Sequence, residues 1–440
     1  MSEYADIKIG NLSLFSFRNY LDPAIVSLFF SSKDLDINQD VKGDSEDEDT
    51  ECYTQYIYKT TVKHAKERLD ARGFTLSALE KLFNNNTIQS IDFSPYLLHL
   101  HVDLAVFEKV GKKRAEKYVT FRKWKNATQK LVKQELKNGN IQWHSDDFAF
   151  TISTECDKII YYALKDDDAK SFYGLKTDVV PIPYVFRLVL DSCDDNSEIK
   201  LDFSNLQYWD VDCIEKALSA TKDIEKTIVL VEGTSDKDIL EFSISKIYPH
   251  LSDLFYFMDF EDANGGKRDG GTSFVIKNLK IFYFSKIKAN FIAIFDNDAE
   301  GYESRYTLIR EIKDWPNNFR ILLYPELELF HKYPTLSPNG KIIEDNIIHK
   351  ACSIELYLPD SIIKDGGTYF PIEWESRKIV KKENGEKEAL YQGVISQKGR
   401  IKESFHNLRK KIERGEESFI LENWSRMKKL LESIVFAFKR

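Results

Sequence analysis

The stretch TIVLVEGTSD, residues 227–236, decides the expected fold. Its first five residues form a continuous apolar run of the kind found in strands that are buried on both faces of a parallel sheet. The run ends directly in Glu232, a helical pattern begins within the next few residues, and Asp236 lies at the same corner. Because open parallel sheets carry their chemistry at the carboxyl ends of their strands, Glu232 is a candidate functional residue.

A second apolar strand also ends in acidic residues. Residues 290–295 run directly into Asp296, and Asp298 follows two positions later. Strands and helices alternate around this point, which predicts an α/β unit whose parallel sheet and right-handed crossovers bring both acidic strand ends to one edge. Glu232 is therefore expected to lie near both aspartates. The expected strands are residues 227–231, 254–260, 290–295 and 319–324, and the expected helices are residues 237–247, 273–284 and 302–312.

The chemistry of this edge follows from its carboxylates. Carboxylates that converge repel one another, which raises their pKa values unless a cation neutralises them. Oxygen ligands without a nearby His or Cys cluster favour Mg²⁺ or Mn²⁺ over zinc. Such an ion activates water and neutralises charge on a phosphodiester. Each acid taken singly is equally well explained as a helix N-cap or a turn residue. Two acidic strand ends in one unit predict a metal site.

The two motifs resemble those of a known domain. VEGTSD (residues 231–236) and FDNDAEG (residues 295–301) are similar to the motifs of the Toprim domain, found in primases, topoisomerases and the overcoming-lysogenization-defect (OLD) family of nucleases. A second acid four residues after the glutamate, here Asp236, resembles the OLD-type version, in which both acids bind metal. The resemblance implies a Rossmann-like Toprim domain that binds Mg²⁺ or Mn²⁺ through Glu232, Asp236, Asp296 and Asp298.

Two later segments extend this resemblance. SIELYL (residues 353–358) is similar to the segment that supplies another metal-binding glutamate in OLD-type nucleases, which implies that role for Glu355. Those nucleases also use a lysine near the end of the domain to stabilise charge in the transition state. Lys398, in the sequence QKGR, is the first candidate for that lysine, and Lys402 is the second.

The N-terminal half resembles a different family. YKTTVKHAKERL (residues 58–69) and YVFRLVL (residues 184–190) are similar to the HEPN/Toprim N-terminal accessory domain. Chains with this architecture are associated with bacterial anti-phage defence, which implies a defence role here. We therefore expect an α+β HEPN/Toprim-associated domain at 1–210, a Toprim catalytic domain at 221–360, and a C-terminal part at 361–440 that completes the Toprim module.

Local patterns in the N-terminal half predict its elements. Residues 7–30 are expected to form short strands with a turn at Gly10–Asn11. Residues 34–51 hold nine carboxylates and one lysine, which predicts a solvated loop. The basic and aromatic stretch 109–137 is interpreted as a solvated helix face, with contact to nucleic acid as the alternative. Helices are expected at residues 54–73 and 76–83, and two strands joined by a turn at residues 182–209.

The C-terminal part combines a hairpin with basic helices. Residues 368–396 are expected to form a hairpin around Asn384–Gly385, followed by two helices within residues 400–438. Residues 398–440 contain twelve Lys or Arg and six Asp or Glu. Lys398, Arg400 and Lys402 are therefore the candidates for contact with a nucleic-acid backbone. Arg400 and His406 also fit the loose Arg-x(4–6)-His spacing of HEPN ribonucleases.

Composition limits the remaining choices. The 440 residues carry a formal net charge of −8, which argues against a surface that is basic throughout, although it permits a basic groove. The five cysteines are far apart and suit a reducing cytosol, and no apolar run is long enough to span a membrane, so a cytoplasmic protein is expected. The glycine-rich residues 264–271 lack P-loop spacing. If ATP gates the enzyme, a partner must therefore supply the ATPase, and an ATPase or a sensor protein is the expected kind of partner, with the N-terminal domain as the candidate for sensing or partner contact.

The sequence as a whole predicts a metal-dependent Toprim endonuclease that hydrolyses phosphodiester bonds in DNA or RNA. Two alternatives remain open. The first is a HEPN-like ribonuclease that needs no metal and depends on His406. The second is a non-catalytic Toprim module that senses or binds, and that requires a partner for activity. The sequence leaves the choice between DNA and RNA open, and it is compatible with a homo-oligomer.

Overall fold

The computed structural model describes residues 4–42, 52–85, 120–138, 181–208, 211–222, 224–258, 271–381 and 387–439. The chain divides into two compact units. Residues 1–224 together with 439–440 form the first, and residues 225–438 form the second. Within the described residues, no helix is both long and apolar enough to cross a membrane.

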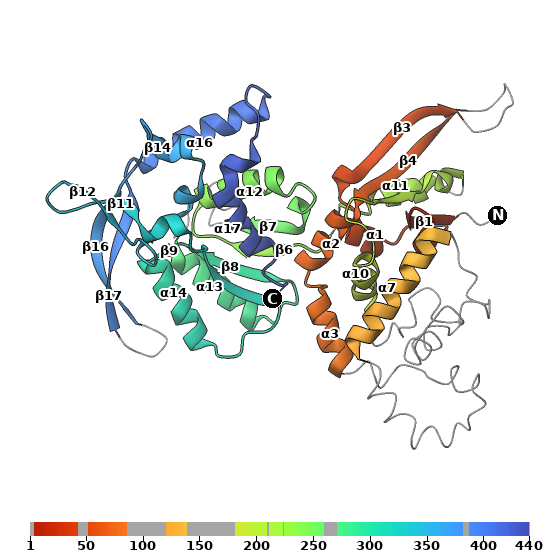
Figure 1. The fold of residues 1–440 in the computed structure, drawn as a ribbon, viewed down its shortest axis with the longest axis horizontal. Helices are drawn as coiled ribbons and strands as arrows, with labels where there is room; N and C mark the ends of the chain where they lie inside the picture. Colours follow the sequence, from red (N-terminus) through yellow and green to blue (C-terminus); the bar gives the residue numbers. More distant parts are fainter. Residues whose placement is uncertain are drawn as a thin grey trace, which may run out of the picture. The chain divides into compact units, whose positions relative to one another are not determined.

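The N-terminal unit is built on a five-stranded sheet in the order β2-β1-β5-β4-β3, with the neighbouring strands antiparallel (Figure 1). Buried Arg68 donates from Nη2 to the carbonyls of Ser27 and Phe30, both at 3.0 Å, and so ties α2 to α1. The strands are β1 (Tyr4–Ile9), β2 (Leu12–Arg18), β3 (Leu35–Lys42), β4 (Cys52–Thr61) and β5 (Glu198–Asp202). The helices are α1 (Pro23–Phe29), α2 (Val62–Ala71), α3 (Leu76–Asn85), α7 (Phe121–Asn138), α10 (Ile182–Leu190) and α11 (Val211–Ser219).

Several local predictions for this unit were wrong. Residues 54–61 belong to strand β4, because β4 pairs with β3 on one side and with β5 on the other, so only the later part of the helix predicted at 54–73 forms, as α2. The helix predicted at 76–83 is confirmed as α3. Residues 182–190 form helix α10 instead of a strand, with a proline in the first turn, where its missing N–H costs nothing. Residues 23–29 are helix α1, and residues 35–42 are strand β3 rather than loop. Residues 43–51 and 109–119 lie outside the described residues.

The C-terminal unit contains a four-stranded sheet whose strands are all parallel, in the order β10-β8-β6-β7. Every residue of β8 is buried, as expected for a central strand covered on both faces. This sheet confirms the predicted mixed α/β class with a parallel sheet. The strands are β6 (Thr227–Leu230), β7 (Phe255–Met258), β8 (Phe291–Phe295) and β10 (Phe319–Leu323).

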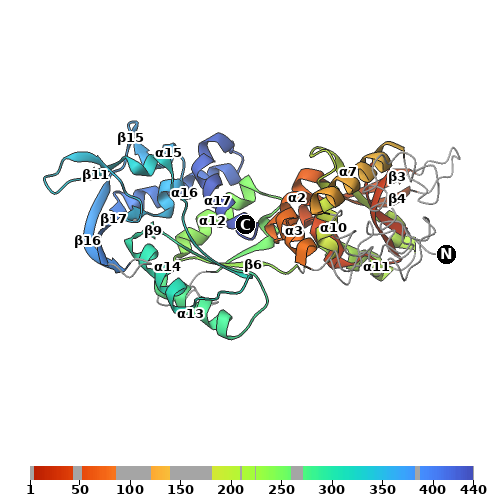
Figure 2. The ribbon, with the colours of Figure 1, turned by 60° about the horizontal axis from the view of Figure 1, so that its bottom comes forward.

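Helices cover both faces of this sheet, as Figures 1 and 2 show. On one face, α13 packs with Phe274, Val275 and Leu279 against apolar residues of β6 and β8, and α14 adds Leu308 to the same core. On the other face, Phe242 of α12 packs against Phe405 and Trp424 of the C-terminal segment. The helices are α12 (Thr234–Ile247), α13 (Thr272–Phe284), α14 (Ala299–Glu311), α15 (Asp360–Ile363), α16 (Lys398–Glu413) and α17 (Ser425–Val435).

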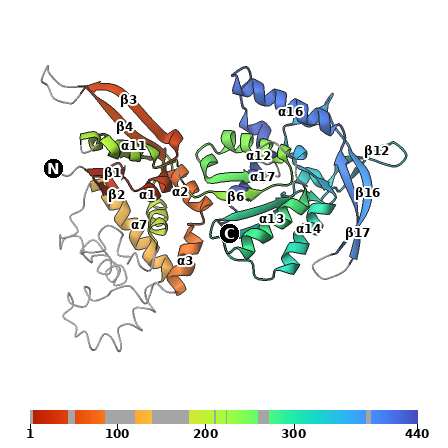
Figure 3. The ribbon, with the colours of Figure 1, turned by 180° about the vertical axis from the view of Figure 1, so that it is seen from behind.

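A second sheet, in the order β12-β11-β16-β17, lies beside α14 (Figure 3). β16 and β17 form the predicted hairpin, with Lys381 paired to Lys387, while residues 382–386 at its turn lie outside the described residues. The two-residue strands β9 and β13 connect this region to the end of β8. The strands are β9 (Asn297–Asp298), β11 (Tyr333–Leu336), β12 (Ile342–Asp345), β13 (Ala351–Cys352), β14 (Lys364–Asp365), β15 (Thr368–Tyr369), β16 (Ile372–Lys381) and β17 (Lys387–Ile395).

Candidate active site

The ends of β6 and β8 are joined directly through Glu232. This residue follows β6, and its Oε1 accepts a hydrogen bond from the backbone N–H of Asp296 at 3.1 Å. Its carbonyl oxygen accepts from the backbone N–H of Gly271, just before α13, at 3.0 Å. Two of the predicted acidic strand ends therefore lie side by side at the carboxyl edge of the parallel sheet, because the sheet places β6 next to β8.

Asp298 occupies the start of helix α14. Its Oδ1 accepts from the backbone N–H of Gly301 at 2.8 Å, which makes Asp298 the N-cap of the helix. Its Oδ2 accepts from Nε2 of Gln392, on strand β17, at 2.5 Å. The N-cap explanation of this acid is thus correct for one carboxylate oxygen. The other oxygen is held by a residue of the C-terminal hairpin.

Asp236 and Glu355 bring two further carboxylates, and two lysines from α16 accompany them. Asp236 lies in the first turn of α12 with 8% of its surface exposed, and Glu355 lies in the 3₁₀ helix η8 (Ile354–Tyr357) with 1% exposed. The Nζ of Lys398 is 3.2 Å from Oε1 of Glu355. The Nζ of Lys402 is 3.9 Å from the same oxygen and donates to Oγ of Ser235 at 3.0 Å.

The carboxyl of Asp296 is influenced by the charges of all four other acids. Burial of its carboxyl raises its pKa well above the ordinary value, and the negative charges of Glu232, Asp236, Asp298 and Glu355 raise it further. Within the described residues, the buried Oδ1 atom of Asp296 has no hydrogen-bond partner. A buried oxygen that is left without a donor is costly, so Oδ1 of Asp296 is an atom that a bound cation could contact.

The neighbouring carboxyls are perturbed in the same direction. Burial and then the charge of Asp298 raise the pKa of Glu232 to about 8. Burial and then the charge of Glu355 raise the pKa of Asp236 to about 7. The pKa of Lys398 is also raised, because the charges of Glu355 and of the aspartates outweigh the opposing effect of burial. Without a cation, Glu232 therefore holds a proton over much of the neutral range.

The oxygen ligands and negative charge of these residues suit a hard divalent cation. All five acids offer oxygen donors, and the unpartnered Oδ1 of Asp296 and the mutual repulsion of the carboxyls are both relieved by a positive charge. Within the described part of the chain, however, no three His, Cys, Asp or Glu side chains already converge into a metal-binding group. The carboxylates would have to turn inward to share an ion, which their repulsion opposes while no ion is present.

Residues that the sequence did not single out complete the surroundings. Oε1 of Gln392 accepts from the backbone N–H of Glu300 at 3.2 Å, and Thr272 donates from Oγ1 to the Glu300 carboxylate at 3.0 Å. Buried Asn297 donates from Nδ2 to the carbonyl of Tyr324 at 2.9 Å. No local pattern distinguishes Gln392, and Asn297 lies within the FDNDAEG motif without a role predicted for it, because its partner is a distant backbone carbonyl.

Arg400 and His406 have no described contact with the five acids. Nη1 of Arg400 binds Oδ2 of Asp365 at 2.8 Å, and its guanidinium lies over the ring of Phe370. Its described contacts therefore involve none of the five acids. His406 is exposed on α16, six positions further along, so the two residues point to different sides of that helix. This placement matches a pair of helix-surface residues.

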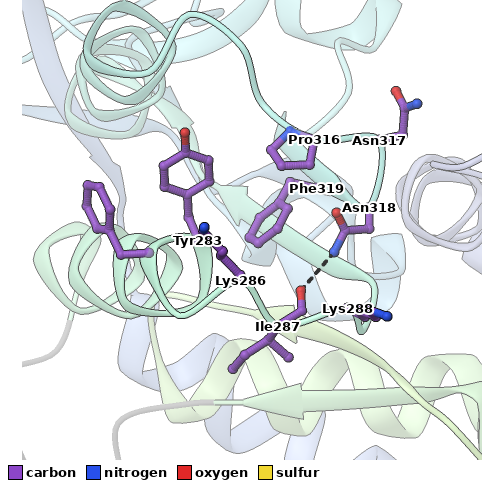
Figure 4. Close-up of a pocket in the computed structure, with 9 residues that line it drawn as sticks. Tyr283, Lys286, Ile287, Lys288, Pro316, Asn317, Asn318 and Phe319 are labelled. Atoms are coloured by element: carbon purple, nitrogen blue, oxygen red, sulfur yellow. Dashed lines mark hydrogen bonds between the residues drawn. The ribbon is translucent and has the colours of Figure 1, made fainter.

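A pocket of about 700 Å³ opens at the opposite edge of the parallel sheet (Figure 4). Its residues lie before β8 and at the start of β10, whereas Glu232, Asp236, Asp296 and Asp298 come after the ends of β6 and β8. Nδ2 of Asn318 donates to the carbonyl oxygens of Ile287 and Ala289 at 3.2 and 2.8 Å and holds the two loops together. The pocket is therefore separate from the acidic site. It is lined by Tyr283, Phe284, Lys286, Ile287, Lys288, Pro316, Asn317, Asn318 and Phe319.

Comparison with known proteins identifies the first unit. Residues 1–214 match the model of a family described as HEPN/Toprim N-terminal domain 1. This match confirms the expected accessory domain, while the resemblance of the second unit to OLD-type nucleases stays a prediction. No curated protein and no solved structure matches the chain significantly.

Proposed function

Because residues 1–214 belong to the HEPN/Toprim N-terminal domain 1 family, we propose that residues 225–438 carry a Toprim-type site that hydrolyses phosphodiester bonds in nucleic acid. The family of the first unit suggests a nuclease-like or defence-related role. The observation that carries the proposal is the group around Asp296, where four further acids raise the pKa of a carboxyl whose Oδ1 is buried without a partner among the described residues. Perturbed carboxyls of this kind concentrate at functional sites.

Glu232, Asp236, Asp296, Asp298 and Glu355 would hold Mg²⁺ or Mn²⁺ in this proposal. The ion would supply charge neutralisation and activation of water. The protein would supply position: the backbone N–H of Asp296 orients Glu232, and the N-cap geometry orients Asp298. Glu232 is only half-buried, so it is placed to exchange a proton with the nucleophile or the leaving group.

Lys398 is the proposed cation for the scissile phosphate. Its side chain is 38% exposed, and its Nζ lies near Glu355, so it can reach a ligand at the sheet edge without leaving the group. The raised pKa of Lys398 keeps its charge at neutral pH. Lys402 is the second candidate, and its contact with Ser235 places it beside the first turn of α12.

The surroundings of the site favour a polyanionic substrate. Twelve Lys or Arg and six Asp or Glu lie within residues 398–440, so this segment is locally basic in an acidic chain. Backbone contacts by such side chains supply most of the affinity for nucleic acid. We therefore propose DNA or RNA as the substrate, a cytoplasmic role in anti-phage defence, and an ATPase or sensor protein as the kind of partner that would gate activity. A homo-oligomer fits the same proposal.

The direct test is a cleavage assay with the purified full-length chain. Plasmid, single-stranded DNA and total tRNA are each incubated with Mg²⁺, Mn²⁺ or EDTA. Wild type is expected to cleave at least one substrate only with a divalent cation, and Asp298→Ala is expected to abolish cleavage. Asp314→Asn is the matched control, because this exposed carboxylate lies in the loop before β10, at the other end of the strands from the acidic group, and its loss is expected to leave the rate unchanged.

Two other outcomes would contradict the proposal. Cleavage at the wild-type rate by folded Asp298→Ala would remove the acidic group from the chemistry. Cleavage of RNA that survives EDTA and is lost in His406→Ala would indicate a HEPN-like ribonuclease instead.

A further inference from the structure

The side-chain amide of Gln392 connects the C-terminal hairpin to the start of α14. Its Nε2 donates to Oδ2 of Asp298 at 2.5 Å, and its Oε1 accepts from the backbone N–H of Glu300 at 3.2 Å. A backbone N–H can only donate, so it requires the amide oxygen on its own side. The NH₂ group must then face Asp298, and the orientation of the amide is fixed by its two partners.

The hairpin is held close to this point by its backbone. The N–H of Gly393, the next residue of β17, donates to the carbonyl of Lys350 at 3.0 Å. A Cβ at position 393 would lie 2.6 Å from Cγ2 of Ile372 and 2.9 Å from Cε3 of Trp374, so only glycine fits here. Ile372 and Trp374 belong to β16, but a Cβ at position 393 would also lie 3.1 Å from Cβ of Ala351 on β13. This contact and the bond to Lys350 place β17 beside β13, which pairs with β9, and so bring Gln392 within reach of Asp298.

Asp298 is thus held at both carboxylate oxygens. Gly301 holds Oδ1 through the backbone, as in any N-cap, whereas the contact at Oδ2 comes from a strand almost a hundred positions away in the sequence. Helix capping alone requires only the first contact. The second contact fixes the rotation of the carboxylate and leaves its remaining lone pairs facing a defined direction.

We propose that Gln392 is a positioning residue, which orients the carboxylate of Asp298 for a divalent cation through the hydrogen bond from its Nε2 atom. This inference rests on the proposed function of the acidic group. Residues that hydrogen-bond to metal ligands change metal affinity or activity by about 10- to 100-fold when they are replaced. The hairpin, which lies outside the parallel sheet, thereby becomes part of the site.

The test measures how Mn²⁺ binding and cleavage depend on the Mn²⁺ concentration in the full-length chain. Gln392→Met keeps the length of the side chain and removes the donor. The half-saturating Mn²⁺ concentration is expected to rise about 10- to 100-fold, by calorimetry and by cleavage, while saturating Mn²⁺ restores most of the rate. Asp298→Ala is not restored in this way, because it removes a ligand. Ile379→Thr, an exposed change on the same hairpin, is the control.

A second variant separates positioning from a purely structural role. Gln392→Glu keeps the acceptor for the Glu300 N–H but places a carboxylate against Asp298. Positioning predicts a loss of about tenfold or more at limiting Mn²⁺ that saturating Mn²⁺ largely restores, whereas a purely structural role predicts a loss that is the same at every Mn²⁺ concentration. Mn²⁺ dependence within about twofold of wild type in both variants overturns the inference but leaves the proposed function intact. A wild type that neither binds Mn²⁺ nor cleaves overturns both.

Discussion

Position 301 has no room for a side chain. A Cβ built there would lie 2.1 Å from the carbonyl oxygen of Asp296, much closer than atoms can approach. The same glycine donates its N–H to Oδ1 of Asp298. Helix α14 can therefore begin directly beside two of the proposed metal ligands only because residue 301 is glycine.

Gly301→Ala is expected to destabilise the C-terminal unit, because the backbone at Asp296 must move to admit the methyl group. Overpacking of this kind costs roughly 1–3 kcal/mol, and more where only backbone can yield. Gly233→Ala is the control: its Cβ would lie 3.6 Å from Oδ2 of Asp236, an ordinary contact. The midpoints of urea unfolding measure the stability of both variants. Equal stabilities would contradict the conclusion that position 301 has no room for a side chain.

The raised pKa of Glu232 makes the stability of the apo protein depend on pH. The pKa of this carboxyl is about 8 in the folded chain and near its ordinary value of 4.5 in the unfolded chain, so the folded state binds more protons between these pH values. The contribution of this proton to the free energy of unfolding is therefore complete below the pKa of the unfolded chain. It is lost as pH rises towards 8, by at most about 1.4 kcal/mol per pH unit for one proton.

Glu232→Gln is expected to flatten this dependence, because the amide does not ionise. In EDTA, the difference in unfolding free energy between variant and wild type should favour the variant more at about pH 8 than at about pH 6. Urea titrations at both pH values measure it. A difference that does not change with pH would show that Glu232 has an ordinary pKa.

At the residue scale, the acidic residues of the site could be predicted from the sequence, but the residues that hydrogen-bond to them could not. Glu232, Asp296 and Asp298 were recognisable because each follows an apolar strand, and the topology of a parallel sheet then brings such strand ends together. Gln392 and Asn297 carry no such signal. Their importance depends on which backbone atoms they meet, and those contacts form only when distant segments fold together.

At the scale of elements, α16 and η8 meet through an ion pair in which the carboxylate is buried and the lysine is partly exposed. Glu355 is 1% exposed, whereas the side chains of Lys398 and Lys402, both on α16, are 38% and 42% exposed. Removing one partner of a buried pair costs about 3–5 kcal/mol, because the other charge stays buried without compensation. Lys402, at 3.9 Å, reduces that cost here.

Lys398→Met is therefore expected to lower stability by about 1–3 kcal/mol, and Glu355→Gln in the same chain to recover most of the loss. Thermal unfolding of the two single variants and the double variant gives the coupling free energy. Additive effects would mean that the two side chains do not interact. Cleavage is expected to stay lost in the double variant, since the lysine has its own role at the phosphate.

Whether an element could be predicted from the sequence depended on how its residues are buried and paired. The parallel strands were recognisable because burial on both faces makes them continuous apolar runs ended by turns. Residues 182–190 show the weakness of that signal, since a short apolar run also suits a buried helix, and here it forms α10. Residues 54–61 became a strand because neighbouring strands pair with both of their edges, a tertiary effect that local periodicity does not contain.

At the scale of the whole molecule, the chain separates into an N-terminal unit with its own antiparallel sheet and a C-terminal unit that holds every proposed ligand. The first unit is a HEPN/Toprim N-terminal domain. In the second unit, the proposed acidic ligands lie at the ends of the parallel strands and in η8, and the two lysines lie on α16. We therefore propose that the metal site lies within residues 225–438.

The most direct measurement is calorimetric titration of the full-length protein with Mn²⁺ at about pH 7, in two buffers with different enthalpies of protonation. Glu232 and Asp236, with pKa values of about 8 and about 7, must lose protons to act as ligands. We expect that Mn²⁺ binds with net release of protons, that its affinity rises with pH through this range, and that Asp296→Asn abolishes binding. Absence of binding by the wild type, or unchanged binding by Asp296→Asn, would contradict the proposed metal site.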